Sequence, residues 1–207
     1  MTFVRRAPGS PSRLGILPGT FNPITIAHLA LASSARNVCD EVLFVLPRVF
    51  PHKPYSGATL EQRLELIEAA VDGHSGFSLG ISEAGLFVEI ANECRNAYGP
   101  GVRLSFLCGR DAAERIANWD YGAPEAFPNM LRRFDLLIAR RQGEYTPPAE
   151  LAAGMDRLNL PDGLDPVSAT EVRQRIARGE AWEHLVPPAI QERVRTIYGR
   201  NGLTVQD

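Results

Sequence analysis

The chain has 207 residues, of which 44% are hydrophobic and 22% charged, and its formal net charge is −2. This composition is ordinary for one soluble globular domain, and it argues against a broad basic surface for nucleic acid. No apolar run approaches the roughly 20 residues of a membrane span, and the three cysteines fit no metal-binding or redox spacing. We therefore expect a cytoplasmic protein with reduced thiols and without a membrane or nucleic-acid partner.

The N-terminal residues differ in composition from the rest of the chain. Residues 1–13 contain three arginines with proline and serine, and they lack the apolar segment of a signal peptide. We predict a flexible N-terminal extension over 1–13 and a single domain over 14–207.

Apolar segments of β-type composition alternate with helical patterns along this domain. Strands are predicted at 14–17, 41–46, 77–81, 102–107 and 134–139, and helices at 24–36, 59–71, 87–97, 111–117, 169–178 and 188–198. Residues 142–166 are rich in proline and glycine and are predicted as a loop with one short element. The alternation predicts an α/β, Rossmann-like fold, a doubly wound parallel sheet with helices on both faces. Ligands of such sheets bind beyond the carboxyl ends of the strands.

The segment Gly19-Thr20-Phe21-Asn22-Pro23 joins the first of these strands to the first helix. Glycine lets the backbone approach a phosphate closely, and Asn22-Pro23 has the pattern of an N-cap residue followed by proline. The free N–H groups at such a helix start bind anions, and Thr25 and His28 share a face from which both can donate to phosphate oxygens. The alternative is a capped helix with an ordinary surface histidine.

With Thr-Ile-Ala-His at 25–28, this segment resembles the signature of the nucleotidylyltransferase superfamily, G-T-F-D-P-x-H-x-G-H. Three positions depart from the signature: Asn22 replaces its Asp, Thr25 its first His, and Ala27 its second Gly. The last histidine, on which the family relies most, is present as His28.

A second segment begins the helix predicted at 169–178. Ser168 and Glu171 form a capping box, S-x-x-E, and this alone would explain the segment. The run from Ser168 to Arg173 also resembles the superfamily motif I-S-S-T-x-I-R, which holds the ATP phosphates; the matching residues are Ser168, Thr170 and Arg173. Arg173 lies about one turn inside the helix, from where a guanidinium can reach an anion at the N-terminus.

Two further segments follow predicted strands and match the same family. Pro51-His52-Lys53, followed by Gln62-Arg63-Leu64, is similar to a P-P-H-K segment and a Q-R-L helix start, which implies Lys53 as a phosphate ligand. The alternative for Lys53 is a solvated loop lysine. Gly109 and Asp111 match G-x-D, whose carboxylate contacts the ATP ribose, although Asp111 could equally be only an N-cap.

The acceptor side of the family pattern is less complete. Trp119 stands where bacterial enzymes of this superfamily that act on pyridine mononucleotides have L-P-T-W, with an aromatic residue near the pyridine ring of the acceptor. The alternative for Trp119 is packing in the core. Arg141 aligns only loosely with an R-P-G segment. Residues 86–91 replace the family's Y-T-x-D-T stretch, and this departure puts the acceptor substrate in question.

These motifs together resemble the nicotinate/nicotinamide mononucleotide adenylyltransferase family. The resemblance implies a single nucleotidylyltransferase domain over 14–207, with C-terminal helices from about 169. It implies adenylyl transfer from ATP to nicotinate or nicotinamide mononucleotide, which gives the dinucleotide and pyrophosphate in NAD biosynthesis. Mg²⁺ is expected to arrive with ATP, and no protein-held metal is expected.

The resemblance also implies a role for each site residue. The catalytic group is His28, Thr25, Lys53 and Arg173; the ATP and phosphate ligands are Gly19, Thr20, Phe21, Ser168, Thr170, Gly109 and Asp111; the acceptor ligands are Trp119 and Asn22.

Two alternatives to this function stay open. One is a nucleotidylyltransferase of the same fold that uses CTP or another phosphate acceptor, which the departure at 86–91 favours. The other is a nucleotide-binding protein without catalysis, which Thr25 and Ala27 would fit but the intact His28 opposes. The sequence also leaves the oligomeric state open, a homo-oligomer included.

Overall fold

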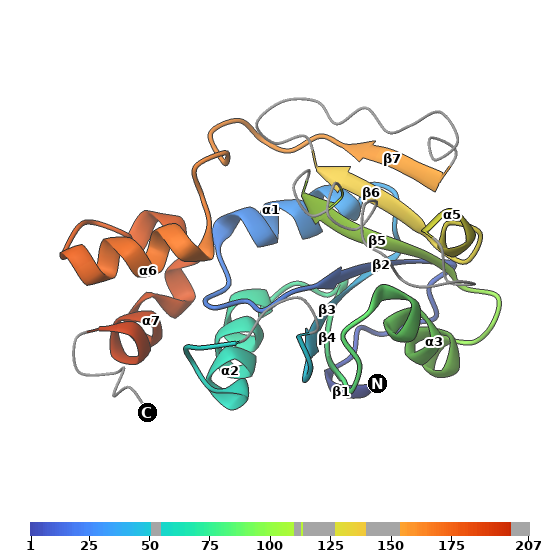
Figure 1. The fold of residues 1–207 in the computed structure, drawn as a ribbon, viewed down its shortest axis with the longest axis horizontal. Helices are drawn as coiled ribbons and strands as arrows, with labels where there is room; N and C mark the ends of the chain where they lie inside the picture. The colour runs from blue at the N-terminus through green and yellow to red at the C-terminus, as the bar shows by residue number, and fades with distance from the viewer. Residues whose placement is uncertain (51–54, 110–112, 114–126, 140–153, 200–207) are drawn as a thin grey trace.

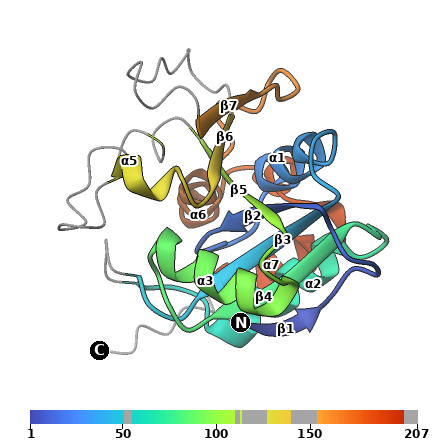
Figure 2. The same ribbon diagram turned by 90° about the vertical axis from the view of Figure 1, so that its right-hand side faces the viewer.

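The computed structural model describes residues 1–50, 55–109, 113, 127–139 and 154–199 of the chain. At its centre lies a seven-stranded sheet in the order β1-β4-β3-β2-β5-β6-β7. The strands are β1 Thr2–Arg5, β2 Arg13–Pro18, β3 Glu41–Pro47, β4 Phe77–Ser82, β5 Arg103–Gly109, β6 Asp135–Ala139 and β7 Met155–Leu158. Only β1 is antiparallel to its neighbour, and the other strands pair in parallel. Figure 2 shows the sheet from β7 at one edge to β1 at the other.

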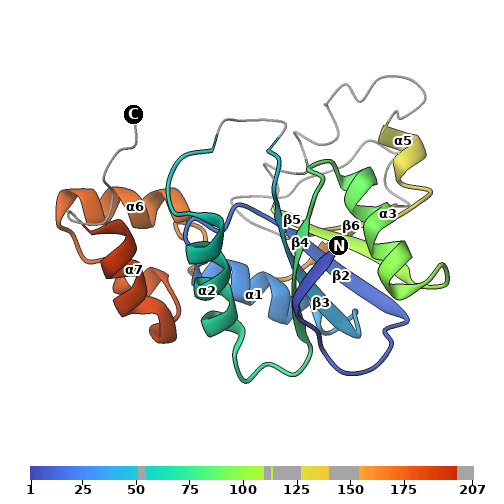
Figure 3. The ribbon, with the colours of Figure 1, turned by 90° about the horizontal axis from the view of Figure 1, so that it is seen from below.

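Helices cover both faces of this sheet (Figures 1 and 3). They are α1 Ile26–Ala35, α2 Leu60–Val71, α3 Phe87–Tyr98, α5 Phe127–Met130, α6 Ala169–Arg178 and α7 Gln191–Tyr198, with 3₁₀ turns at Glu183–Leu185 and Pro188–Ile190. Figure 3 shows α1, α2, α6 and α7 on one side of the sheet and α3 and α5 on the other. No helix in the described ranges is both long enough and apolar enough to cross a membrane.

The central strand β3 shows why both faces are covered. All of its residues are buried. Val42 and Phe44 belong to the core beneath α1 and α2, whereas Leu43 and Val45 belong to the core beneath α3. Successive side chains of a strand point to opposite faces, so a continuous apolar run requires cover on both sides. The predicted doubly wound α/β fold is therefore confirmed.

The direction of winding changes at β2, and this places the candidate site. The chain passes from β2 to β3 and β4 on one side, then crosses back to β5, β6 and β7 on the other. The segment 19–25 after β2, which we name the β2–α1 turn, lies at this switch point, where ligands of such sheets bind. The Gly19 N–H donates to the Val45 carbonyl of β3 at 3.1 Å and holds the turn against the sheet.

The prediction of a flexible extension over 1–13 is wrong. Thr2–Arg5 forms the edge strand β1, which pairs with β4 in a register that sets Phe3 opposite Gly80. The Phe3 ring packs edge-on against Tyr98 of α3, with ring centroids 5.6 Å apart. A side chain at position 80 would lie 2.9 Å from the Met1 sulfur, so the glycine makes room for the N-terminus. A four-residue strand with one core side chain is too short to stand out as an apolar run.

Most of the other predicted elements are confirmed, with ends that differ by a residue or two. Thr59 and Ser168 cap α2 and α6 as predicted, accepting from the N–H of Gln62 at 3.2 Å and of Glu171 at 3.1 Å. Glu171 does not complete the capping box, because its carboxylate accepts from Arg175 at 2.6 Å. The short element within 142–166 is β7, and the helix predicted at 111–117 falls outside the described residues.

The start of the first helix differs from the prediction. The helix α1 begins at Ile26, and its N-cap is Thr25 rather than Asn22. The Asn22–Pro23 peptide bond is cis and lies within the turn. The cap is built differently because the His28 side chain, three residues into the helix, accepts from the Thr25 N–H, as the third residue of a capping box does.

Candidate active site

The β2–α1 turn is folded around one aromatic side chain. Phe21 has a φ of +44°, which is uncommon for a bulky residue, and its ring is buried beneath the turn. The ring contacts His28 edge-on, with centroids 5.1 Å apart, and Phe44 of β3 at 5.8 Å. A side chain at Gly19 would lie only 3.1 Å from the Phe21 ring, so the turn needs glycine there. Backbone strain of this kind concentrates at functional sites.

His28 is held in one orientation by the residue that caps its helix. The Thr25 N–H donates to His28 Nδ1 at 3.0 Å, and the Thr25 hydroxyl lies 2.8 Å from the same nitrogen. An amide N–H can only donate, so Nδ1 accepts, and a neutral imidazole then carries its proton on Nε2. His28 can therefore donate through Nε2.

Thr25 is enclosed by the surrounding structure. Its side chain is fully buried, and its hydroxyl is engaged with the His28 ring. The prediction of a direct phosphate ligand fits this arrangement poorly, because a buried hydroxyl beneath the imidazole orients the ring instead.

The second predicted motif meets the first one in the structure. From α6, the Arg173 guanidinium donates to the Asn22 carbonyl and to the Thr170 hydroxyl, the latter at 3.5 Å. The start of α6, with its cap Ser168, is thus joined to a turn about 150 positions earlier. The structure therefore brings the segment that resembles the second motif against the segment that resembles the first.

Asn22 links three segments rather than facing an open site. Its side-chain oxygen accepts from the Tyr198 hydroxyl at 2.6 Å and from the Ala58 N–H at 3.4 Å, and its amide donates to the Ser56 carbonyl at 3.0 Å. Only 4% of Asn22 is exposed. The role of Asn22 as an acceptor ligand stays a prediction, and in the structure its amide already binds other parts of the chain. The phenol of Tyr198 reaches it from the last helix, a contact that no local pattern shows.

Arg63 is a site residue to which the sequence assigned no role. It lies in the first turn of α2, and its guanidinium donates to the carbonyls of Thr20 at 2.9 Å and Thr59 at 3.3 Å. The same group lies over the Tyr55 ring, 4.2 Å from its centroid. The available signal was the Gln62-Arg63-Leu64 segment, which resembled a family helix start without indicating what the arginine binds.

The other predicted residues divide into two groups. Gly109 ends β5 beside β2 and lies in register with Ala139, at the same edge of the sheet as the turn. Lys53, Asp111, Trp119 and Arg141 lie outside the described residues. Residues 86–91, which replace the Y-T-x-D-T stretch, begin α3, and Phe87 there stacks on Phe106 with centroids 4.3 Å apart.

The three cysteines are all buried and free. Burial raises the pKa of Cys39 to about 11 and the pKa values of Cys94 and Cys108 to about 12. Their thiols are therefore protonated at neutral pH, and none is an activated nucleophile.

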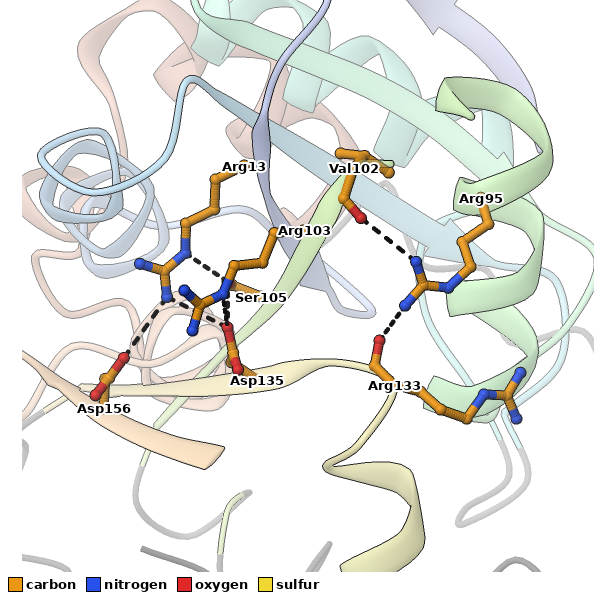
Figure 4. Close-up of polar contacts among 8 residues, drawn as sticks. All are labelled: Arg13, Arg95, Val102, Arg103, Ser105, Arg133, Asp135 and Asp156. Carbon is orange, nitrogen blue, oxygen red and sulfur yellow. Dashed lines mark hydrogen bonds and ion pairs between the residues drawn. The ribbon is translucent and has the colours of Figure 1, made fainter. Parts of the chain in front are cut away.

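A second polar cluster lies at the opposite edge of the sheet, where the strands begin (Figure 4). There Arg13, Arg103 and Asp135 are the first residues of β2, β5 and β6, and Asp135 accepts from Arg103 at 2.7 Å. In the same view Arg95 of α3 donates to the carbonyls of Val102 and Arg133. This cluster joins strands and helix ends, away from the β2–α1 turn.

A mostly parallel α/β sheet with a glycine turn and a helix start after its central strand, joined to an arginine of a later helix, has the architecture in which many proteins bind nucleotides. The family whose model matches residues 16–175 is described as cytidylyltransferase-like. The match covers more than half of the chain, which therefore belongs to this family.

Curated relatives narrow the family further. The chain is 31% identical over 193 residues to a protein from Gloeobacter violaceus, covering 86% of this chain and 91% of the relative. It is 32% identical over 194 residues to one from Bordetella avium, covering 88% and 94%. Both are named "Probable nicotinate-nucleotide adenylyltransferase". The chain belongs to the nicotinate-nucleotide adenylyltransferase family, whose members are nucleotidyltransferases, and the resemblance seen in the sequence is confirmed.

Solved structures agree on the fold. One is described as Plasmodium falciparum nicotinic acid mononucleotide adenylyltransferase complexed with NaAD. It has a TM-score of 0.72 and 18% sequence identity, and the match covers 90% of this chain and 97% of that one.

Proposed function

We propose that this protein transfers the adenylyl group of ATP to nicotinate or nicotinamide mononucleotide, giving the dinucleotide and pyrophosphate. One observation carries the proposal: Arg173 of α6 donates to the Asn22 carbonyl of the β2–α1 turn, so the two segments that resemble the family's phosphate motifs meet at the switch point of the sheet. Family membership supplies the reaction, since both curated relatives carry the name of a nicotinate-nucleotide adenylyltransferase.

The chemistry requires little beyond positioning and charge. A phosphate oxygen of the mononucleotide attacks the α-phosphorus of ATP, a new P–O bond forms, and the bond to the bridging oxygen of the β-phosphate breaks. The attacking phosphate is already anionic at pH 7, so no general base is needed. Catalysis then consists of aligning the two substrates and stabilising the charge that develops on the phosphate oxygens.

His28 is the central group in this proposal. Its Nε2–H donates to an oxygen on the reacting phosphates, and the N-terminus of α1 adds a favourable dipole at the same place. Thr25 keeps the ring in the orientation that its N–H and hydroxyl impose on Nδ1. In this role Thr25 is a positioning residue.

The remaining roles follow the family resemblance. Arg173, with the hydroxyls of Ser168 and Thr170, stabilises the departing pyrophosphate, and Lys53 assists it. Gly19 and Thr20 supply the backbone of the phosphate site. Asp111, after Gly109, holds the ATP ribose, and Trp119 faces the pyridine ring of the acceptor.

We treat Mg²⁺ as part of the substrate, Mg-ATP. Magnesium prefers oxygen ligands and is commonly bound through substrate phosphates. Among the described residues, the side chains that hydrogen-bond to the backbone of the turn include the His28 imidazole and the guanidinium groups of Arg63 and Arg173, which do not suit magnesium.

The test is pyrophosphate release from Mg-ATP with a panel of acceptors: nicotinate mononucleotide, nicotinamide mononucleotide, phosphopantetheine and glycerol phosphate, with CTP in parallel. Turnover with a pyridine mononucleotide is the expected result, and the ratio of the two forms gives the specificity. The panel is broad because the apolar side chains of residues 86–91 pack against the core at the start of α3, and the family's polar stretch is missing there. Turnover only with CTP or a non-pyridine acceptor, or nucleotide binding without any turnover, would overturn the proposal.

A further inference from the structure

Arg63 is a buried cation directly beneath the β2–α1 turn. Only 4% of it is exposed. Its guanidinium donates to the Thr20 carbonyl of the turn at 2.9 Å and to the Thr59 carbonyl at the start of its own helix at 3.3 Å. Burying a charged group is costly unless the charge is compensated. The position of this residue therefore calls for a reason beyond packing.

The partners of Arg63 hold it in place without neutralising it. Among the described residues, two of these partners are backbone carbonyls, and the others are the rings of Tyr55 and Phe50, whose centroids lie 4.2 and 5.7 Å from the guanidinium carbon. No carboxylate within the described ranges forms an ion pair with Arg63. The guanidinium keeps its charge in proteins, so a positive charge faces the turn.

The Thr20 hydrogen bond also fixes a peptide plane. In a trans peptide the carbonyl of one residue and the N–H of the next point in opposite directions. With the Thr20 carbonyl directed at Arg63, the Phe21 N–H is turned to the other side of the turn. Backbone N–H groups that point away from the protein interior are what a turn uses to bind a phosphate.

We propose that Arg63 is a positioning residue of the nucleotide site: it orients the Thr20–Phe21 peptide and supplies buried positive charge that the phosphates of ATP and pyrophosphate compensate. This inference rests on the proposed function, because it requires that the β2–α1 turn binds those phosphates. It adds a second arginine to the site, one that acts from below the turn, whereas Arg173 reaches the turn from α6.

The chain contains a matched control for this proposal. Arg95 also clasps two backbone carbonyls, those of Val102 and Arg133, but it does so at the other edge of the sheet, where the strands begin (Figure 4). Arg95→Met removes the same chemical group from the same kind of contact without touching the turn. A purely structural role for Arg63 predicts similar behaviour of the two methionine variants.

The experiment compares wild type, Arg63→Met, Arg63→Lys and Arg95→Met. Calorimetry at 25 °C gives the dissociation constants of Mg-ATP and of inorganic pyrophosphate, and thermal unfolding gives the midpoint with and without each ligand. We expect Arg63→Met to weaken both ligands about tenfold or more, since a charge at short range in a partly buried site has a large effect. Arg63→Lys, which keeps the charge, should recover part of the loss, and Arg95→Met should bind within about twofold of wild type.

Each result decides the question. Unchanged affinities in Arg63→Met, or equal losses in the two methionine variants, would overturn the proposal, and so would Arg63→Lys binding no better than Arg63→Met. If Arg63→Met does not fold, Arg63→Gln replaces it, because glutamine keeps one N–H donor without the charge. Failure of both neutral variants to fold beside a folded Arg95→Met would make Arg63 a structural residue and also refute the proposal. A wild type that binds neither ligand would instead refute the proposed function.

Discussion

Two pairs of arginines, one at each edge of the sheet, have different kinds of partner. Where the strands begin, Arg103 pairs with Asp135 at 2.7 Å, and Arg13 lies 3.5 Å from the same carboxylate (Figure 4). Where the strands end, Arg63 and Arg173 donate to carbonyls of the β2–α1 turn. A carboxylate neutralises its arginine and joins neighbouring strands, whereas a carbonyl orients the guanidinium and leaves its charge for an anion.

This difference in partner separates arginines that stabilise the sheet from arginines that serve the proposed site. It teaches that the number of arginines says little about where a nucleotide binds, since both edges hold several. What distinguishes these two pairs of arginines is the group that each faces: a carboxylate for Arg13 and Arg103, a carbonyl of the turn for Arg63 and Arg173. Substitutions of these arginines where the strands end (the carboxyl edge) should therefore lower catalysis first. Substitutions where the strands begin (the amino edge) should lower stability first.

The largest expected effect comes from His28. We expect His28→Ala to lower turnover about a hundredfold or more, because one preorganised donor to a developing charge is removed. The measurement is pyrophosphate release with Mg-ATP and nicotinate mononucleotide.

The matched variant is His28→Gln. Glutamine at the third helical position can still accept from the Thr25 N–H, as in an ordinary capping box, but it has no imidazole. It should restore any lost stability and leave turnover low. A folded His28→Ala protein with near-normal turnover would contradict the mechanism.

Arg173 and Arg103 test the comparison directly, because each is an arginine at one edge. Arg173→Met should lower kcat/KM for Mg-ATP by about 10- to 100-fold, the range expected when a hydrogen bond from a charged group is lost. Arg103→Met, which removes the partner of Asp135, should stay within about twofold of wild type. Comparable losses of kcat/KM in the two variants would break the distinction between the edges.

Asp135→Asn should show the opposite pattern. The carboxylate faces both Arg103 and Arg13, and its side chain is only 16% exposed. We expect the free energy of unfolding in urea to fall by about 1 kcal/mol, less at high salt, with turnover unchanged. A loss of turnover without a loss of stability would mean that charge at the amino edge reaches the site.

The sheet and its covering helices were predictable because their patterns are local. Glu41–Pro47 is apolar after its first residue and buried on both faces, and Leu60–Val71 has a cap and a helical apolar stripe. The β2–α1 turn was predictable for the same reason, since Gly19 and His28 lie within one short segment. The residue types within this segment were sufficient to predict a phosphate-binding site there.

What the sequence did not reveal depends on distant partners. The strand Thr2–Arg5 forms by pairing with β4, which lies far along the chain. The burial of Asn22 depends on Tyr198, 176 positions later, and the contact of Arg63 with Thr20 spans 43 positions. Such contacts have no periodicity and no fixed spacing, so residue types along the chain cannot indicate them.

The smallest expected effect concerns Asp40, which also lies at the amino edge. Its carboxylate accepts from the N–H groups of Ser12 and Arg13, both at 2.8 Å, and these hydrogen bonds lower the pKa of Asp40 below its ordinary value of 3.8. A lowered pKa in the folded state means that the ionised carboxylate contributes stability above the unfolded pKa, and that this contribution is lost as the pH falls through the folded pKa.

Asp40→Asn should therefore reduce the free energy of unfolding by roughly 0.5 kcal/mol at neutral pH, a small effect because the group is exposed to solvent. The difference from wild type should shrink on acidification below the ordinary aspartate pKa of 3.8, and turnover should not change at any pH where both proteins are folded. Urea titrations from pH 7 downward measure the difference. If the difference in the free energy of unfolding stays constant as the pH falls, the amide of the Asp40→Asn variant fails to cap the two N–H groups for steric reasons. A change in turnover would show that the amino edge, too, takes part in function.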